Sequence, residues 1–317
     1  MGFLTRCKRP FLFAFLLQFC NMLFSFFLKT FLILFEKQQL VCKAMEEKKR
    51  ANPLCVIILV LLALIYFVPV LMMLLGSVKP QYQAARFDLS WPDEFLFTNY
   101  AEVIQTGKIW NGYKNSVLIT VPATFCAVLF GAMAGTCISR RNDGVAKKGY
   151  YYFIFGLTIT LQIASTFSLL KFLNIYGSYF AVICLFIAIR LPFTIMTFCS
   201  FAKGVPREID EAAIIDGCNP LQLFFRVLMP ILKPVTLTNI IISAIDIWNN
   251  FMIPLFFLGS SQKWTIPLAV YNFFGRYSRE WQHVFAVLTL TIMPMLILFA
   301  VLQKYIIGGM TSGAVKG

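Results

Sequence analysis

The chain has 317 residues, of which 59% are hydrophobic and only 13% are charged, with a mean hydropathy of +0.75 and a formal net charge of +14. So few polar groups could not cover that much apolar surface, so the composition excludes a soluble domain and indicates an integral membrane protein. The basic residues are scattered over short segments between apolar runs. This pattern favours anchoring to anionic lipid over binding of nucleic acid.

Residues 1–44 are atypical. A Phe-rich stretch over 11–35 is interrupted by Lys29 and flanked by basic residues, and no small-residue cleavage site follows it. We interpret 1–44 as an N-terminal extension that is either an over-extended reading frame, with the natural start at Met45, or a segment lying on the membrane surface. The remaining 45–317 form the expected transmembrane domain.

Six apolar segments after Met45 are long enough to cross a hydrocarbon core of about 30 Å. We therefore predict an all-α, polytopic membrane protein with six core transmembrane helices. The predicted spans are about 54–77, 113–138, 150–168, 179–202, 235–258 and 283–306. Between the first two spans, 78–112 is a mixed polar and aromatic loop that we expect to pack as an external cap.

The densest basic cluster between spans fixes the orientation, because positive residues accumulate on the cytoplasmic side. It lies in 139–149 and contains Arg140, Arg141, Lys147 and Lys148. The segment 206–234, two spans later, is also flanked by basic residues. Both clusters predict that the two ends of the core domain are cytoplasmic.

Three features inside the spans are informative. Gly131 and Gly135 have the G-x-x-x-G spacing that lets helices approach closely, although small residues are common in membrane helices. The third span is polar, and we expect its side chains to face protein or a water-filled path; they are Thr158, Thr160, Gln162, Ser165, Thr166 and Ser168. Arg190, beside Pro192, is either a pore-facing ion pair or a kink residue that binds carbonyls or snorkels.

The segment 206–234 predicts a folded cytoplasmic loop. It has prolines at 206, 220, 230 and 234 and several charged residues near its start. Apolar residues at helical spacing predict a first helix of about three turns after Pro206, and Asn219-Pro220 should stop it before a second short helix over 221–228.

The same segment carries a motif. Glu211-Ala212-Ala213 is followed by Gly217 and, nine residues later, by Val227-Leu228-Met229-Pro230. This pattern resembles the EAA motif of the permease subunits of ABC importers, E-A-A-x3-G-x9-I-x-L-P, with Val227 and Met229 in place of the isoleucine and leucine. Further stretches are similar to carbohydrate permeases of the maltose type, so the resemblance covers about Leu54 to Gly317; they are 97–100, 115–116, 248–251 and 303–317.

The resemblance implies a type I permease fold in the bacterial inner or plasma membrane. It implies a pore-forming subunit of an ATP-driven sugar importer that works by alternating access. The expected partners are a second homologous permease, an ATPase dimer, an extracytoplasmic solute-binding protein and membrane lipid. The first helix of the loop would be the coupling helix that docks on the ATPase, using Glu208, Asp210, Glu211, Ala212, Ala213, Asp216, Gly217 and Pro230.

Asp246, Trp248, Asn249 and Asn250 interrupt the fifth span and are candidates for the substrate path. Amide and carboxylate groups suit sugar hydroxyls, and an indole suits a flat sugar face. The alternative is that these residues only join helices within the bundle.

No catalytic constellation is visible, so we predict that the chain is not an enzyme. It lacks the G-x-x-x-x-G-K-[ST] phosphate loop, so ATP would bind a separate ATPase subunit and no cofactor is expected. The one histidine, His283, is interpreted as an interfacial residue at the start of a helix, and no metal site is expected. Alternatives are a permease for a polyol or glycerol-phosphate-type solute and, from a different class, a non-transporting membrane scaffold. Neither the third span nor the 246–251 residues would be needed by a scaffold.

Overall fold

The computed structural model describes residues 53–141, 143–273 and 280–314, and the predicted N-terminal extension over 1–44 lies outside this range. The described part of the chain contains helices and loops and no strand, which confirms the all-α prediction. The α-helices are α2 (Pro53–Val78), α3 (Gln81–Ala84), α4 (Thr98–Thr106), α5 (Ile109–Arg140), α6 (Gly144–Gly156), α7 (Ile163–Phe172), α8 (Tyr179–Lys203), α9 (Glu208–Ile215), α10 (Pro220–Gln222), α11 (Met229–Ile231), α12 (Lys233–Trp248), α13 (Met252–Phe257) and α14 (Trp281–Ala314). Three other helical segments are η1 (Leu223–Leu228), η2 (Ser261–Lys263) and η3 (Ile266–Phe273).

Three of the described helices are long and apolar enough to cross a membrane, namely Ile109–Arg140, Tyr179–Lys203 and Trp281–Val301. A fourth span results if Pro220–Ile231 and Lys233–Trp248, which meet at a bend of 81°, are counted together. The described helices therefore do not confirm the predicted number of six spans. The first predicted span is covered by α2, whose 26 residues extend over about 39 Å at 1.5 Å per residue.

The chain divides into two compact units. The first contains the described residues up to Trp110 together with Asn249–Phe251 and Pro267–Ile292. The second contains Asn111–Trp248, Met252–Ile266 and the chain from Met293 onward.

In the first unit, the loop after α2 is held by buried polar side chains. Asn99 donates to the carbonyls of Ser77 (2.9 Å) and Lys79 (3.1 Å), which explains one residue of the carbohydrate-permease pattern at 97–100. Lys79 is buried, and its ammonium donates to the Asp88 carboxylate at 2.8 Å. The ammonium and the Ser90 hydroxyl hold the pKa of Asp88 at about 2, below its ordinary value of 3.8.

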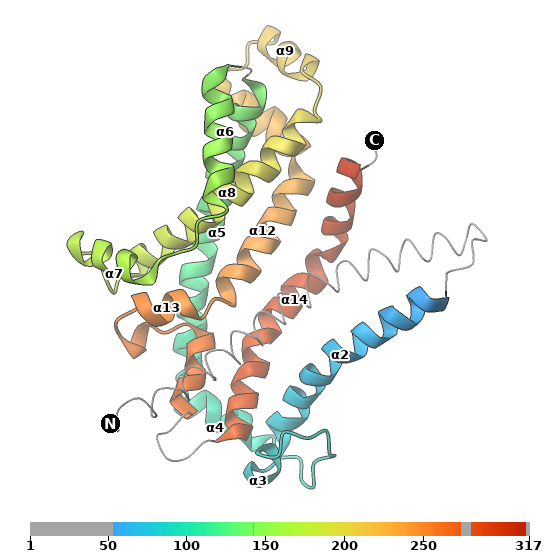
Figure 1. The fold of residues 1–317 in the computed structure, drawn as a ribbon, viewed down its shortest axis with the longest axis vertical. Helices are drawn as coiled ribbons and strands as arrows, with labels where there is room; N and C mark the ends of the chain where they lie inside the picture. The colour runs from blue at the N-terminus through green and yellow to red at the C-terminus, as the bar shows by residue number, and fades with distance from the viewer. Residues whose placement is uncertain (1–52, 142, 274–279, 315–317) are drawn as a thin grey trace, which may run out of the picture. The chain divides into compact units, whose positions relative to one another are not determined.

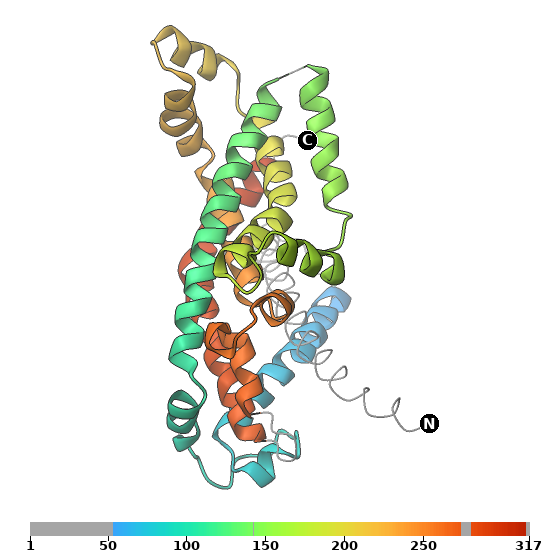
Figure 2. The same cartoon turned by 90° about the vertical axis from the view of Figure 1, so that its left-hand side faces the viewer.

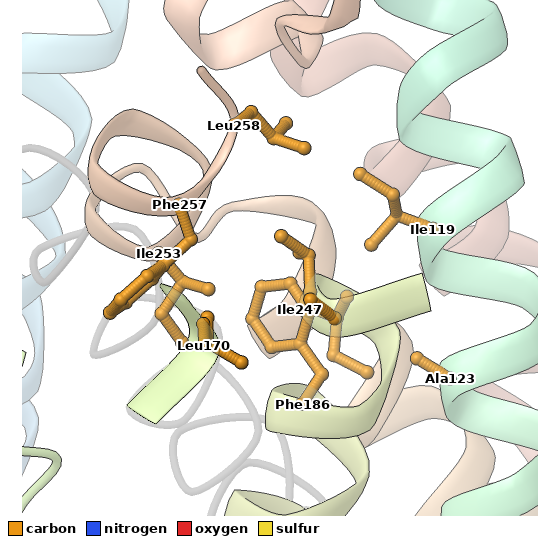
Figure 3. Close-up of a cluster of buried hydrophobic side chains, with 10 residues drawn as sticks. Ile119, Ala123, Leu170, Phe186, Ile247, Ile253, Phe257 and Leu258 are labelled. Carbon is orange, nitrogen blue, oxygen red and sulfur yellow. The ribbon is translucent and has the colours of Figure 1, made fainter. Parts of the chain in front are cut away.

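In the second unit, α8 contacts α6, α12 and α13. Figure 2 shows α5 as one long helix, with its carboxyl end, the start of α6 and α9 at the same end of this unit. An apolar cluster centred on Phe186 of α8 and Ile247 of α12 joins α5, α7, α8, α12 and α13 (Figure 3). This cluster packs the five helices against one another.

The two glycines of α5 lie where it meets α8, as the G-x-x-x-G spacing predicts. A side-chain carbon on Gly131 would overlap Thr194, and one on Gly135 would lie 2.7 Å from the Ile195 carbonyl oxygen. Close helix approach therefore requires glycine at both positions.

The predicted third span, 150–168, is two helices. Helix α6 ends at Gly156 and α7 starts at Ile163, with a non-helical connection between them. Three consecutive β-branched residues, Thr158, Ile159 and Thr160, weaken helix propensity there. The polar side chains that we predicted to face protein or a water-filled path are mostly not covered by this chain. The prediction for their surroundings therefore stays open within a single chain.

The predicted fifth span, 235–258, is also broken. Helix α12 ends at Trp248 and α13 starts at Met252. Pro254 disfavours a continuous helix here, because a proline ring clashes with the carbonyl four residues earlier, here that of Asn250. Proline alone does not break a helix in this chain, since α5, α8 and α14 continue through Pro122, Pro192 and Pro294.

Candidate functional site

The helix α9, the predicted coupling helix, is built by strong local signals. Glu208, Asp210 and Glu211 occupy its first turn, where carboxylates complement the positive end of the helix dipole. Its end is set by Gly217, with φ +83°: Gly217 N–H donates to the Ile214 carbonyl and Cys218 N–H donates to the Ala213 carbonyl, each at 3.0 Å. This is a Schellman motif, which needs a left-handed residue and therefore favours glycine. The motif glycine thus ends the helix, earlier than the predicted stop at Asn219-Pro220.

Asn219 and Pro220 instead start the next helical segment. Asn219 caps α10 by accepting from the Gln222 N–H at 2.8 Å, and Gln222 accepts in return from the Asn219 N–H. The following π-helical segment η1 buries Phe224 and Leu228 in an apolar cluster with Phe198 and Ala202 of α8. The second half of the motif is therefore an anchor on the spans. Pro230 is exposed in α11, beside the 81° bend into α12.

The predicted docking residues of α9 do not share one environment. Glu208, Glu211, Ala212, Asp216 and Gly217 are exposed, whereas Ala213 is buried. Two neighbours that the motif does not include, Ile214 and Ile215, are 60% and 85% exposed. Large apolar side chains with so little cover, rimmed by carboxylates, are typical of a contact surface.

Asp210, also predicted to dock, faces the spans instead. Its side chain is 13% exposed, and its Oδ2 lies 2.7 Å from Arg140 Nε at the end of α5. Arg140 Nη2 donates to Asp210 Oδ1 at 3.2 Å, and Nη1 donates to the carbonyls of Ala202 (3.2 Å) and Val205 (2.9 Å). One guanidinium therefore joins the end of α5, the end of α8 and the start of α9.

A second ion pair lies inside the helix bundle. Arg190 of α8 donates from Nη1 to Asp246 Oδ2 of α12 at 2.5 Å, and its Nε donates to the Ser243 hydroxyl at 3.4 Å. Both side chains are largely covered, with exposed fractions of 15% and 27%. Of the two interpretations of Arg190, the structure supports the ion pair. The carboxylate predicted for the substrate path is therefore engaged by a cation from another helix.

The remaining substrate-path candidates lie at the break after α12. Trp248 is buried, and its ring is 6.2 Å from that of Tyr113. Asn249 is buried, and neither its amide nitrogen nor its amide oxygen has a hydrogen-bond partner within the described residues. Asn249 and Asn250 belong to the other unit, so the structure does not place them relative to Asp246.

Asn115 and Ser116, which the carbohydrate-permease pattern includes, hold a loop of the second unit. Asn115 donates to the carbonyls of Gln262 (2.8 Å) and Trp264 (3.0 Å) and accepts from the Tyr179 hydroxyl at 2.8 Å. The Ser116 hydroxyl accepts from the Ile266 N–H at 2.9 Å. These bonds attach 262–266 to α5 at the end opposite Arg140.

His283 lies near the start of α14, as predicted. Its Nδ1 is 2.7 Å from Glu280 Oε2 and its Nε2 is 2.9 Å from Glu102 Oε2, so the ring ties α4 to α14 within the first unit. Among the described residues, no group of three or more His, Cys, Asp or Glu side chains could hold a metal ion.

Comparison with known proteins decides the family. Residues 127–312 match the model of the binding-protein-dependent transport system inner membrane component family. The chain belongs to this family. Its members are permeases of ABC transporters and not enzymes.

Several relatives have named substrates. The melibiose/raffinose/stachyose import permease protein MelC of Bacillus subtilis is 30% identical over 81% of this chain and 94% of its own length. The diacetylchitobiose uptake system permease protein NgcG of Streptomyces coelicolor is 29% identical over 82% of this chain and 87% of its own length. The multiple sugar-binding transport system permease protein MsmG of Streptococcus mutans is 30% identical over 80% and 93%.

The fold is also found among solved structures. A chain of a bacterial ABC transporter involved in the import of the acidic polysaccharide alginate superposes with a TM-score of 0.70 at 19% identity, covering 80% of this chain and 95% of that one. The permease fold predicted from the sequence is therefore confirmed.

Sequence reasoning missed three parts of the site. Arg140 was counted only as a topology marker, and Ile214 and Ile215 were not considered. A helical spacing of apolar residues that leaves two adjacent isoleucines outside the buried face would have indicated the latter. The partners of Arg140 and Arg190 are 70 and 56 residues away, so no local pattern contains them.

Proposed function

We propose that this chain is the pore-forming permease subunit of an ATP-driven importer of a saccharide, working by alternating access. The observation that carries the proposal is α9: a short helix with an exposed face of acidic and apolar side chains, held at one end of the bundle. The names of the relatives, several of which import oligosaccharides, supply the substrate class.

The exposed face of α9 is the surface we assign to the ATPase. Ile215 supplies an apolar anchor, and Glu208 and Glu211 supply charges that basic groups of a groove can pair with. Gly217 leaves open space around the helix end, where a side chain on a partner can approach. Of the residues predicted to dock, we retain those that are exposed. We reassign Ala213 and Asp210 to packing within the chain.

Two groups of residues are assigned to the solute path, each within its own unit: Asp246 and Trp248 at the end of α12 in the second unit, and Asn249 and Asn250 in the first. The unpartnered amide of Asn249 can donate to and accept from a sugar hydroxyl, and Trp248 can pack against a sugar face. Asp246 contributes through its pair with Arg190, which presents a dipolar group without net charge. A neutral polar path suits an uncharged saccharide better than a glycerol phosphate, which is the alternative solute class.

The proposal requires further subunits. ATP would bind a separate ATPase dimer, a second homologous permease would complete the path, and an extracytoplasmic binding protein would deliver the solute. The α9 end of the second unit and both ends of the core domain would lie in the cytoplasm, which agrees with the basic residues around them.

The docking surface can be tested by co-purification. We expect Ile215→Arg and Glu211→Lys to insert normally but to lose the ATPase, because a charge replaces an anchor and a charge pair becomes repulsive. Val145→Arg is the matched control, since Val145 is 71% exposed in the first turn of α6 and outside the proposed surface. If both α9 variants retain the ATPase at the wild-type stoichiometry and import normally, another surface of the chain binds the ATPase.

A further inference from the structure

Outside the exposed face of α9, Arg140 is the centre of a junction of polar contacts between three helices. Its guanidinium contacts two carbonyls and both oxygens of Asp210, at 2.7–3.2 Å. Both side chains are largely covered, with exposed fractions of 17% and 13%. A surface pair held by chance would not combine four such contacts with this degree of burial.

The junction is complementary in charge along its whole length. Ala202 and Val205 lie at the carboxyl end of α8, which carries the negative end of a helix dipole, and Arg140 faces them. Asp210 lies in the first turn of α9, the positive end of another dipole. The order of charges is therefore negative, positive, negative, positive from α8 through Arg140 and Asp210 to α9. This order favours one position of α9.

Asp210 is the one acidic residue of α9 that forms an ion pair within the described part of the chain. Helix α9 also packs against η1, which belongs to the same loop. The connection from α8 to α9, 204–207, is not helical and by itself would let α9 turn. The Arg140 junction is thus a direct side-chain link from α9 to α5, made by an ion pair and a hydrogen bond.

Helix α5 can carry a displacement from that link across the unit. It is a single helix of 32 residues, about 48 Å long, with Arg140 at one end. Near its other end, Asn115 and Ser116 hold the 262–266 loop, and along its length Gly131 and Gly135 pack directly on α8.

We propose that Arg140 and Asp210 form the mechanical joint between the coupling helix and α5, so that Arg140 is a positioning residue for energy coupling. This inference rests on the proposed function, since it assumes that α9 docks on an ATPase. It assigns to the joint a role that docking itself does not require. When the joint is lost, the ATPase stays bound and hydrolyses ATP, but the movement of α9 that it causes is no longer transmitted to α5.

The test is the amount of saccharide imported per ATP hydrolysed, in proteoliposomes that hold the full complex and its binding protein. The probe is the radiolabelled saccharide that the wild type imports from a panel of melibiose, raffinose, stachyose and diacetylchitobiose. We expect Arg140→Gln and Asp210→Asn to lower this ratio at least tenfold, with ATPase bound at the wild-type stoichiometry, and Asp210→Glu to recover part of it. Arg141→Gln is the matched control: Arg141 is next in the chain and 60% exposed, and its pair with Asp143 lies outside the joint.

The other outcomes overturn the joint in distinguishable ways. A ratio within twofold of wild type in Asp210→Asn shows that α9 moves α5 by another contact. Loss of bound ATPase in that variant makes Asp210 a docking residue. If the variants are depleted from the membrane, and the protein that does insert imports as much saccharide per ATP as the wild type, the pair has only a structural role. A wild-type chain that binds no ATPase overturns the proposed function and, with it, the inference about the joint.

Discussion

Two Arg–Asp pairs in the second unit join helices with the same chemistry in different surroundings. Arg140–Asp210 lies where helices end, and the guanidinium is supplied with two carbonyls as well as a carboxylate. Arg190–Asp246 lies in the interior of α8 and α12, where the further acceptor of Arg190 is the Ser243 hydroxyl at 3.4 Å. In each pair one guanidinium nitrogen, Arg140 Nε or Arg190 Nη2, is buried without a hydrogen-bond partner among the described residues, although Arg140 Nε lies 2.7 Å from Asp210 Oδ2. The two pairs are covered to a similar degree, with exposed fractions of 17% and 13% for the first and 15% and 27% for the second, so they differ in their further acceptors. The first pair fixes the position of helix ends and keeps two backbone carbonyls as acceptors, whereas the second neutralises charge within the helix interior.

The largest effect is expected from removing one partner of the interior pair. Asp246→Ala leaves the Arg190 charge uncompensated, which lowers the free energy of unfolding by about 3–5 kcal/mol. Melting temperature in detergent and the amount in the membrane measure it. The double variant Arg190→Leu with Asp246→Leu removes both charges and should recover most of the loss. A stable Asp246→Ala protein would contradict the assignment of this pair as charge neutralisation.

A smaller loss is expected where α5 and α8 approach each other. Gly135→Leu places a side chain against the Ile195 carbonyl and Phe198, so the two helices must separate, lowering the free energy of unfolding by about 1–3 kcal/mol. Separation also moves Arg140 away from the end of α8, so import per ATP should fall with it. Gly144→Leu is the control, because the space around Gly144 is open. Equal stability of the two variants would show that the helices can part without cost.

The pair at the helix ends should affect stability less than the interior pair. Asp210→Asn should lower the free energy of unfolding by about 1–2 kcal/mol, because the Arg140 guanidinium keeps the Ala202 and Val205 carbonyls as acceptors once the carboxylate is gone. The melting temperature of this variant, measured beside that of Asp246→Ala, checks the order. If Asp210→Asn is the less stable of the two, the distinction between the pairs is wrong.

The smallest effect is expected at Lys79–Asp88, because the Asp88 carboxylate is the most exposed of the three. The buried Lys79 ammonium also keeps two other acceptors, the Asp88 carbonyl at 3.0 Å and the Ser90 hydroxyl at 3.2 Å. Because the pKa of Asp88 is lowered from 3.8 to about 2 by Lys79, its stabilising contribution is present above pH 3.8 and is lost as pH falls through about 2. The difference in melting temperature between the wild type and Asp88→Asn should therefore be constant near neutral pH and disappear at about pH 2. A difference that is unchanged over the whole range would exclude the ion pair as its source.

Local signals made the helix α9, to which we assign ATPase docking, predictable. The acidic first turn of α9 and the spacing from Glu211 to Gly217 and Pro230 lie within one short segment, and the observed helix uses them as caps and anchors. The direction in which each side chain points was not predictable in the same way. Asp210 and Glu211 are adjacent in sequence, yet one is held by Arg140 and the other is exposed.

Long-range pairing and helix breaks limited the rest of the prediction. Hydropathy alone cannot locate a break inside an apolar segment, so 150–168 and 235–258 were each expected as one span. Pro254 carried a partial signal for the second break, because it disfavours a helix that continues through Asn250, although Pro122, Pro192 and Pro294 lie inside continuous helices. The β-branched run at 158–160 is a weaker signal, since such residues are common in membrane helices. The burial of Asn249 depends on tertiary packing, so the local sequence pattern could not predict it.

The central claim, ATP-driven import of a saccharide through a complex that contains this chain, is tested most directly by solute uptake. The complete complex is reconstituted in proteoliposomes with the binding protein outside and ATP inside, and radiolabelled saccharides are supplied one at a time. We predict that at least one saccharide accumulates inside against its gradient, only when ATP is present and only when this chain is included. No accumulation of any saccharide, or uptake that is equal without ATP, would contradict the account.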